Sequence, residues 1–257
     1  MNATRYLVIL VVSLSVYLIF NCNRYIENFD ATTNRESGTG TTQMVINVDQ
    51  VRFGYVAKTW KEIAKREITE FPLPLPLGKI KRPPANTSKT TVTEILYLKN
   101  LNDSLTPDKL ALAEKFNTYR SVVRYFLKYA GENGLKHSQA YIKRAYNDTL
   151  TLCLKLQLMY DRPTPIQLAV INGIRFKRVG SDSPTPSYPC CQSLIARVLA
   201  GLLIYNNPSQ KDNIDNIIKN VDLSQLYGAR NFPSDISAAE EVADVILKFI
   251  KKLEYNI

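Results

Sequence analysis

The chain has 257 residues, a formal net charge of +10 and 45% hydrophobic residues, which suits an N-terminal accessory region followed by one domain with a buried core. The positive charge favours anionic partners such as membrane head groups. The basic residues are dispersed, and no long run of them is typical of a nucleic-acid-binding arm, so nucleic acid is not an expected partner.

The first predicted element is a membrane anchor over residues 1–24. Residues 6–20 carry no charge, and as a helix they span about 22 Å, slightly less than a hydrocarbon core of ~30 Å. A cleaved signal peptide is the alternative, but no small-x-small cleavage site follows Phe20. Arg5 precedes the run, while Glu27 and Asp30 follow it, so the positive-inside rule places the rest of the chain across a virion or secretory-pathway membrane.

A stalk and a proline-rich arm are predicted over residues 25–89. Residues 25–45 are rich in Thr, Asn and Gly and indicate a flexible linker. The apolar spacing of residues 48–68 suits one helix or two short elements. In residues 71–76 every second residue is proline, which excludes a helix and predicts an extended arm.

Residues 90–257 are predicted to form an all-α domain that is helical throughout, because apolar residues recur at helical spacing and no stretch alternates as a strand does. Thr106 before Pro107 marks a helix start, with threonine as the N-cap and proline in the first turn. Residues 193–205 are the most apolar and are expected to be the most buried helix. The other expected helices cover residues 90–101, the segment after Pro107, and 119–129, 136–159, 214–226 and 236–253.

Four cysteines (Cys22, Cys153, Cys190 and Cys191) form no Cys-x-x-Cys pair and have no histidine partner, so no metal site is predicted. A disulfide between the adjacent Cys190 and Cys191 would be strained. We expect reduced thiols and no disulfide framework. Cys22 follows the apolar run, which makes it either a palmitoylation candidate or an ordinary free thiol.

Formal glycosylation sequons begin at Asn86, Asn102 and Asn147. Such triplets arise often by chance in an Asn-rich chain, and Asn147 falls inside a predicted helix. We do not expect all three to be used.

Three short blocks resemble the active site of the superfamily of type 2 phosphatidic acid phosphatases, class A acid phosphatases and vanadium haloperoxidases. That family carries Lys-x6-Arg-Pro, then Pro-Ser-Gly-His, then Ser-Arg-x5-His-x3-Asp. The blocks stand in the same order here and cover, with their flanks, roughly residues 90–254. They are Lys155 with Arg162-Pro163, then Pro186-Ser187-Tyr188-Pro189-Cys190-Cys191-Gln192-Ser193, and then Ser224-Gln225, Asn231 and Asp235.

The resemblance implies a haloperoxidase-like helical bundle in which the reactive groups are missing. The two histidine positions hold Gln192 and Asn231; neither amide can act as a general acid or as a nucleophile. Gln225 replaces a cationic clamp on the phosphoryl oxygens. Cys191 replaces a glycine where the backbone approaches the anion. Vanadate binding in the peroxidase branch also uses the missing third-block histidine, so no cofactor is expected.

Lys155, Arg162 and Asp235 survive, next to Cys190 and Cys191. They form either a remnant anion pocket or ion pairs within the bundle, in which Asp235 pairs directly with Lys155 or Arg162. The only histidine, His137, lies about 27 Å from Lys155 along one continuous helix and does not substitute.

We therefore expect a membrane-anchored, catalytically inactive protein with a structural or binding role and with unidentified protein partners. Its richness in Asn, Ile, Lys and Tyr is typical of AT-rich genomes, and a virion membrane component is one interpretation. One alternative is a divergent lipid or acid phosphatase that uses a Cys190 or Cys191 thiolate activated by Lys155 and Arg162. Another is a module that binds anionic lipid or phosphate through Arg162.

Overall fold

The computed structural model describes residues 47–71 and 80–254, within a compact unit that begins at Asn47. The predicted anchor, residues 25–46 of the predicted stalk and prolines 72, 74 and 76 lie outside the described residues. Within the described ranges, no helix has the length and apolar character needed to cross a membrane.

All regular structure in the described residues is helical, which confirms the predicted all-α class. Residues 172–190 contain no helix, so the expectation of an uninterrupted helical domain is wrong there, and α7 was not foreseen. The elements are η2 (Val48–Gln50), α2 (Lys58–Ala64), α3 (Lys89–Asp103), α4 (Pro107–Lys115), α5 (Tyr119–Glu132), α6 (Gln139–Tyr160), α7 (Pro165–Ile171), α8 (Cys191–Asn206), η4 (Pro208–Gln210), α9 (Lys211–Tyr227) and α10 (Pro233–Glu254).

Side-chain caps fix where several helices begin. Thr106 accepts a hydrogen bond from the Lys109 amide, with Pro107 in the first turn of α4, as the sequence predicts. Thr164 caps α7 through a capping box, in which its hydroxyl and the Gln167 side chain each accept a hydrogen bond from the other residue's amide. Such caps satisfy amides that have no partner inside the helix.

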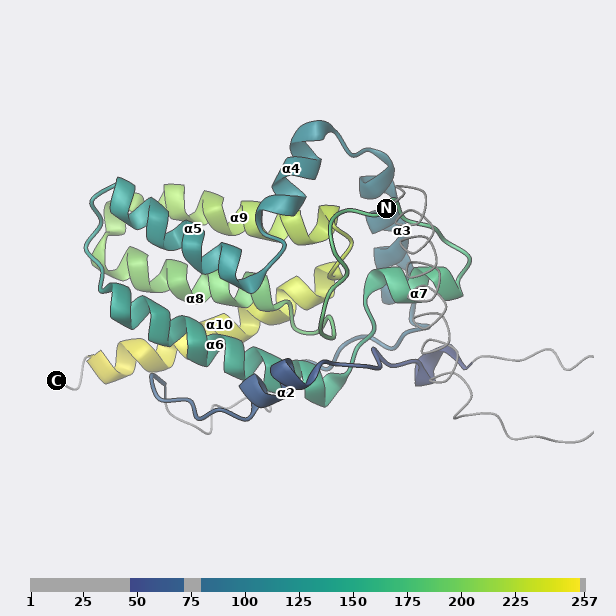
Figure 1. Cartoon of the computed structure of the whole chain (residues 1–257), viewed down its shortest axis with the longest axis horizontal. Helices are drawn as coiled ribbons and strands as arrows, with labels where there is room; N and C mark the ends of the chain where they lie inside the picture. The colour runs from purple at the N-terminus through teal and green to yellow at the C-terminus, as the bar shows by residue number, and fades with distance from the viewer. Residues whose placement is uncertain (1–46, 72–79, 255–257) are drawn as a thin grey trace, which may run out of the picture. The chain divides into compact units, whose positions relative to one another are not determined.

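The core is built around α8, which contacts α5, α6, α9 and α10. Figure 1 shows these five helices lying alongside one another. Leu194, Ile195 and Leu199 of α8 are completely buried, and α8 is the most buried helix of the described part, as predicted. Gly201 permits the close approach of α10, because a Cβ there would lie 2.5 Å from a methyl carbon of Leu247.

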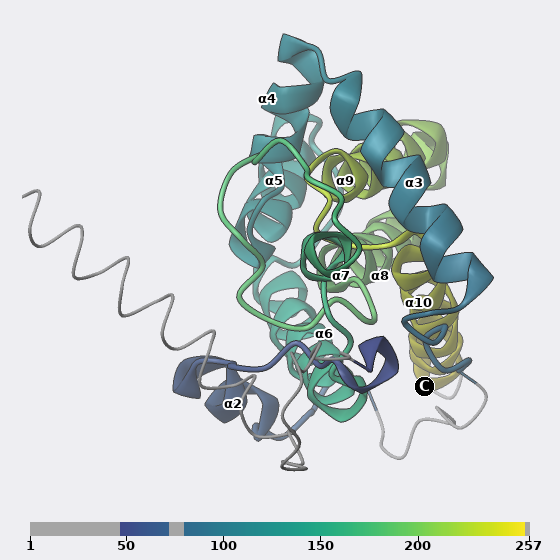
Figure 2. The same ribbon diagram turned by 90° about the vertical axis from the view of Figure 1, so that its right-hand side faces the viewer.

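A second, smaller core lies at one end of the bundle, where α3 and α7 meet (Figure 2). Its buried side chains are Ile95, Leu98, Leu168, Ala169 and Phe232. Phe232 immediately precedes α10, so this cluster holds the start of α10 against α3 and α7. The candidate site lies here.

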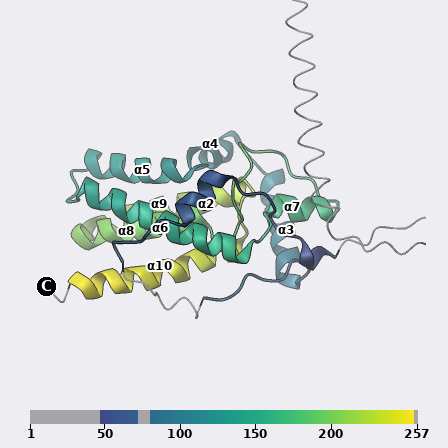
Figure 3. The same ribbon diagram turned by 60° about the horizontal axis from the view of Figure 1, so that its bottom comes forward.

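Residues 47–71 pack on the helical domain, although the sequence suggested that they belong to the stalk and arm. In Figure 3 α2 lies against α6, and these two helices are in contact. Val56 and Phe71 are buried. The compact unit therefore begins well before residue 90.

Two of the three sequon asparagines are buried and serve as hydrogen-bond donors. The Asn86 amide donates to the carbonyl oxygens of Val48 and Val51, over 2.8 and 3.0 Å. The Asn102 amide donates to the Lys177 carbonyl oxygen over 3.0 Å. Only Asn147, on α6, is exposed, so the folded chain leaves one sequon accessible.

Candidate functional site

The three sequence blocks converge at the ends of α6, α8 and α10, where backbone hydrogen bonds join them. The Ser187 amide donates to the Arg162 carbonyl oxygen over 3.0 Å, and the Ser187 hydroxyl donates to the Pro163 carbonyl oxygen over 2.9 Å. The Cys190 amide donates to the Asp235 carbonyl oxygen over 3.0 Å. The parts of the three blocks around Arg162, Ser187 and Asp235 therefore meet in space.

Arg162 lies at the centre of this region and is only 2% exposed. Its Nη1 donates to Asp235 Oδ1 over 2.5 Å, and its Nη2 lies 3.6 Å from Glu94 Oε2. The guanidinium carbon is 4.0 Å from the centre of the Phe232 ring. The ion pair with Asp235 that the sequence suggested is present, and two carboxylates of the chain itself neutralise the arginine.

Both carboxylates are held in place by further hydrogen bonds. Asp235 Oδ2 accepts from the Phe232 amide over 2.7 Å, and Glu94 accepts from the Ser234 amide and hydroxyl over 2.7 and 2.8 Å. Burial raises the pKa of Asp235 to about 6, against the lowering effects of Arg162 and of the Phe232 amide, and Glu94 adds to the rise. Two fixed carboxylates thus share one buried guanidinium.

Glu94 lies on α3, outside the three blocks, and sequence reasoning missed it. A signal existed, because Glu94 falls at helical spacing among the buried residues Thr91, Ile95 and Leu98. A carboxylate on an otherwise buried face requires a cationic or hydrogen-bonding partner.

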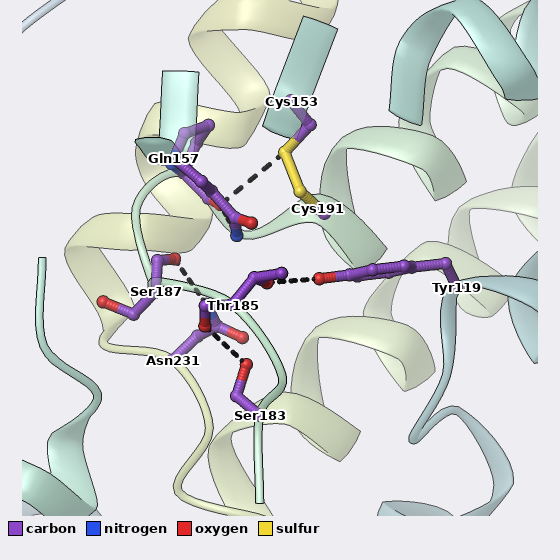
Figure 4. Close-up of a disulfide and its surroundings, with 9 residues drawn as sticks. Tyr119, Cys153, Gln157, Ser183, Thr185, Ser187, Cys191 and Asn231 are labelled. Carbon is purple, nitrogen blue, oxygen red and sulfur yellow. Dashed lines mark hydrogen bonds between the residues drawn. A yellow bond between two sulfur atoms is a disulfide. The ribbon is translucent and has the colours of Figure 1, made fainter. Parts of the chain in front are cut away.

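The two positions that hold histidine in the family are occupied by buried amides. Asn231 Nδ2 donates to the Ser187 carbonyl oxygen over 2.6 Å (Figure 4). The Asn231 side chain is therefore held as a hydrogen-bond donor to the segment that precedes α8. Gln192 lies in the first turn of α8 and is 8% exposed. Neither side chain can attack phosphorus or transfer a proton near neutral pH.

The expectation of reduced thiols is wrong for two cysteines, because Cys153 of α6 and Cys191 of α8 form a disulfide (Figure 4). Their Cα atoms are 5.7 Å apart and their sequence separation is 38. The sequence considered only a strained disulfide between the adjacent Cys190 and Cys191. The packing of α6 against α8 instead brings Cys153, which is distant in the sequence, next to Cys191. Cys190 remains free and completely buried, and burial raises the pKa of its thiol to about 12.

Lys155 is not brought to Arg162. Its Nζ donates to the Arg66 carbonyl oxygen over 3.2 Å. On α6 it lies two residues from Cys153 and from Gln157, and the Gln157 amide donates to the Pro189 carbonyl oxygen over 3.0 Å. A separation of two residues points Lys155 to the other side of the helix. His137 precedes the first residue of α6, at the end of the helix opposite Arg162, and it also takes no part in the site.

Gln225 is completely buried and hydrogen-bonded on both sides. Its amide donates to the Phe116 carbonyl oxygen over 2.9 Å, and its oxygen accepts from Arg230 Nε over 3.4 Å. Arg230 also donates to the carbonyl oxygens of Ala113 and Val179, and burial lowers its pKa. Among the described residues no carboxylate pairs with Arg230, so neutral oxygens alone hold this buried guanidinium.

These residues do not fit a bound oxyanion such as phosphate or vanadate. Arg162, the cation best placed by the motif, is already neutralised, and Asn231 offers no nitrogen lone pair. The Nε of Arg162 and Oε1 of Gln157 are buried and lack hydrogen-bond partners in the described part of the chain. Of these two atoms only Arg162 Nε is a donor, and a bound oxyanion needs several hydrogen-bond donors around it.

Comparison with known proteins gives a likeness in structure only. No family model matches the sequence, and no curated protein is significantly similar to it. The structure resembles a bacterial vanadium-dependent iodoperoxidase, with a TM-score of 0.54 and 13% identity over 68% of this chain and 52% of that one. It also resembles the holo form of a bacterial vanadium-dependent chloroperoxidase, with a TM-score of 0.51 and 14% identity over 74% of this chain and 54% of that one.

The chain thus spans about half the length of the structures it matches. At this level of identity the likeness establishes the fold, and the chain has the helical fold of the vanadium haloperoxidases. The fold predicted from the three blocks is confirmed.

Proposed function

We propose that this chain is a membrane-anchored, non-catalytic protein on a phosphatase-like scaffold, with a structural or binding role. The observation that carries the proposal is the ion-pair cluster at Arg162. An anionic substrate needs a guanidinium whose charge is not already neutralised. Asp235 and Glu94 lie 2.5 and 3.6 Å from the Arg162 guanidinium and neutralise it. The apolar run at residues 6–20 supports the anchor.

Opening this cluster for a phosphate is costly. Breaking a buried ion pair by removing one partner costs about 3–5 kcal/mol, since the remaining charge stays buried and unpaired. A phosphate entering beside Asp235 and Glu94 would also meet two like charges. The surroundings of Arg162 therefore oppose anion binding as well as catalysis.

The alternative of a cysteine-dependent phosphatase loses support on three grounds. Cys191 is in a disulfide, and the raised pKa of Cys190 keeps its thiol protonated at neutral pH. Only a thiolate is a competent nucleophile. Cys190 is moreover completely buried, so no substrate reaches it in the folded chain.

Binding of phosphate and of vanadate to the full-length chain tests the proposal. We expect that any binding detected by calorimetry is unchanged in Arg162→Met, because this arginine is already paired. In a matched variant, Glu94→Gln, one of the two competing carboxylates is removed while the shape of the side chain is kept. Saturable binding in the parent that disappears in Arg162→Met contradicts the proposal.

A further inference from the structure

Helices α5 and α6 are neighbours (Figure 3). A groove between them is lined by three basic side chains. The groove has a volume of about 320 Å³ and is lined by Arg120, Val123, Arg124, Leu127, Lys143, Tyr146 and Asn147. Lys143 lies about 26 Å along α6 from its last residue, Tyr160. The groove is therefore separate from the site around Arg162.

The three cations of the groove have no acidic partner in the part of the chain that the structure describes. Arg120, Arg124 and Lys143 are exposed, and none forms an ion pair with a residue that the structure describes. Nearby cations behave differently, as Lys128 pairs with Glu132 and Arg144 pairs with Glu70. Arg120 and Arg124 are one helical turn apart on α5, so their side chains lie on the same face. Three like charges thus line one groove without a carboxylate partner among the described residues.

The remainder of the groove is apolar or donates hydrogen bonds. Val123 and Leu127 are half-buried and form an apolar floor. Tyr146 is half-buried, and burial raises the pKa of its phenol, which keeps its proton available for donation. The Asn147 amide adds another donor. A ligand that fits must therefore combine anionic acceptor oxygens with a short apolar portion.

We propose that this groove binds the phosphate of an anionic lipid headgroup at a membrane surface. Arg120, Arg124 and Lys143 contact the phosphate oxygens, and the glycerol and first acyl carbons pack on Val123 and Leu127. Guanidinium groups match phosphate geometry through paired hydrogen bonds. The apolar floor favours a lipid over a soluble phosphate, and the net charge of +10 draws the chain toward an anionic surface. The proposal is independent of whether the Arg162 site is catalytic.

Vesicle binding of the full-length chain tests this site. The measured quantity is the ratio of the partition coefficients into phosphatidylglycerol-containing and pure phosphatidylcholine vesicles, because contributions of residues 6–20 that are common to both largely cancel in it. The groove variant is Arg120→Gln, Arg124→Gln, Lys143→Gln. The matched control is Arg82→Gln, Arg175→Gln, Lys219→Gln. It removes the same charge from exposed positions elsewhere on the chain that form no ion pair with a described residue.

Each cation at an anionic surface contributes about fivefold to the partition coefficient, so we expect the loss of three cations in the groove variant to lower the ratio roughly a hundredfold. We expect the control to lower the ratio less than about fivefold. Equal losses in both variants assign the effect to net charge and overturn the proposal, as does an unchanged ratio in the groove variant. All six substituted side chains are exposed, so thermal melting is expected to be unchanged.

Glycerol 3-phosphate separates a lipid from a soluble ligand. We expect it to bind only weakly, and Leu127→Gln to reduce vesicle partition without changing that weak binding. If glycerol 3-phosphate binds the parent tightly without vesicles and the groove variant loses that binding, the ligand is a soluble phosphate and the lipid assignment is wrong.

Discussion

Removing the disulfide between Cys153 and Cys191 should cost a large part of the stability of the domain. In the double variant Cys153→Ala, Cys191→Ala both positions stay apolar, so the main loss is the cross-link itself. The bond closes a loop with a sequence separation of 38. The loop-entropy relation then gives about 4 kcal/mol for a loop of this size. That is a substantial fraction of the roughly 5–15 kcal/mol that stabilises a typical domain.

The assay is urea unfolding of the parent and of the double variant, each with and without a reducing agent. We expect the parent to lose about 4 kcal/mol of unfolding free energy on reduction and the variant to be insensitive to it. Cys22→Ser is the matched control and should behave as the parent, because Cys22 is not part of the bond.

Thiol labelling of the unfolded, unreduced parent provides an independent check. Mass spectrometry should find Cys190 modified, and Cys153 and Cys191 protected. Labelling of Cys153 and Cys191 without a reductant, together with an unfolding midpoint that does not respond to reduction, would show that the two cysteines are not cross-linked.

The ion-pair cluster and the packing of Arg230 give three more predictions. Arg162→Met should lower the unfolding free energy by about 3–5 kcal/mol, because Asp235 and Glu94 keep buried charges without a partner; an effect below about 1 kcal/mol in urea unfolding is evidence against the cluster. Asp235, with its pKa raised from 3.8 to about 6, binds its proton more tightly in the folded state. Its contribution of about 3 kcal/mol is therefore complete below about pH 4 and is lost as the pH rises through 6, and Asp235→Asn should abolish this decrease in a pH series of unfolding curves. Gly228→Ala places a Cβ 2.5 Å from Arg230 Nη1, so we expect a loss of about 1–3 kcal/mol in thermal unfolding, and no loss contradicts the described packing.

The fold was largely accessible from the sequence, because its signals are local. The Thr106-Pro107 start signal and the apolar run of α8 depend on neighbours within a few turns. In the region after α7 the general expectation of a domain that is helical throughout is wrong, although no individual helix was predicted between residues 159 and 193. It contains Gly173 and Gly180, both at positive φ, and a proline-rich approach to α8. Those residues are turn signals, and they locally interrupt the helical pattern of the rest of the domain.

The candidate site was only partly accessible, because its decisive contacts join distant segments. The pair between Arg162 and Asp235 was one of the arrangements that the motif left open once a histidine was missing. Glu94 lies 68 residues before Arg162 in the chain, and nothing local connects the two. The partner of Cys191 was likewise set by the packing of α6 on α8, which residue spacing does not encode.

Hydrolysis of a generic phosphomonoester by the full-length chain tests whether the site around Arg162 is catalytic. An active acid phosphatase serves as the positive control, and the Gln192→His, Asn231→His double variant is measured alongside. We expect no turnover above the enzyme-free rate in the parent, and none in the variant, because Asp235 and Glu94 still neutralise Arg162. Turnover in the parent that Arg162→Met abolishes would show that the chain is a phosphatase.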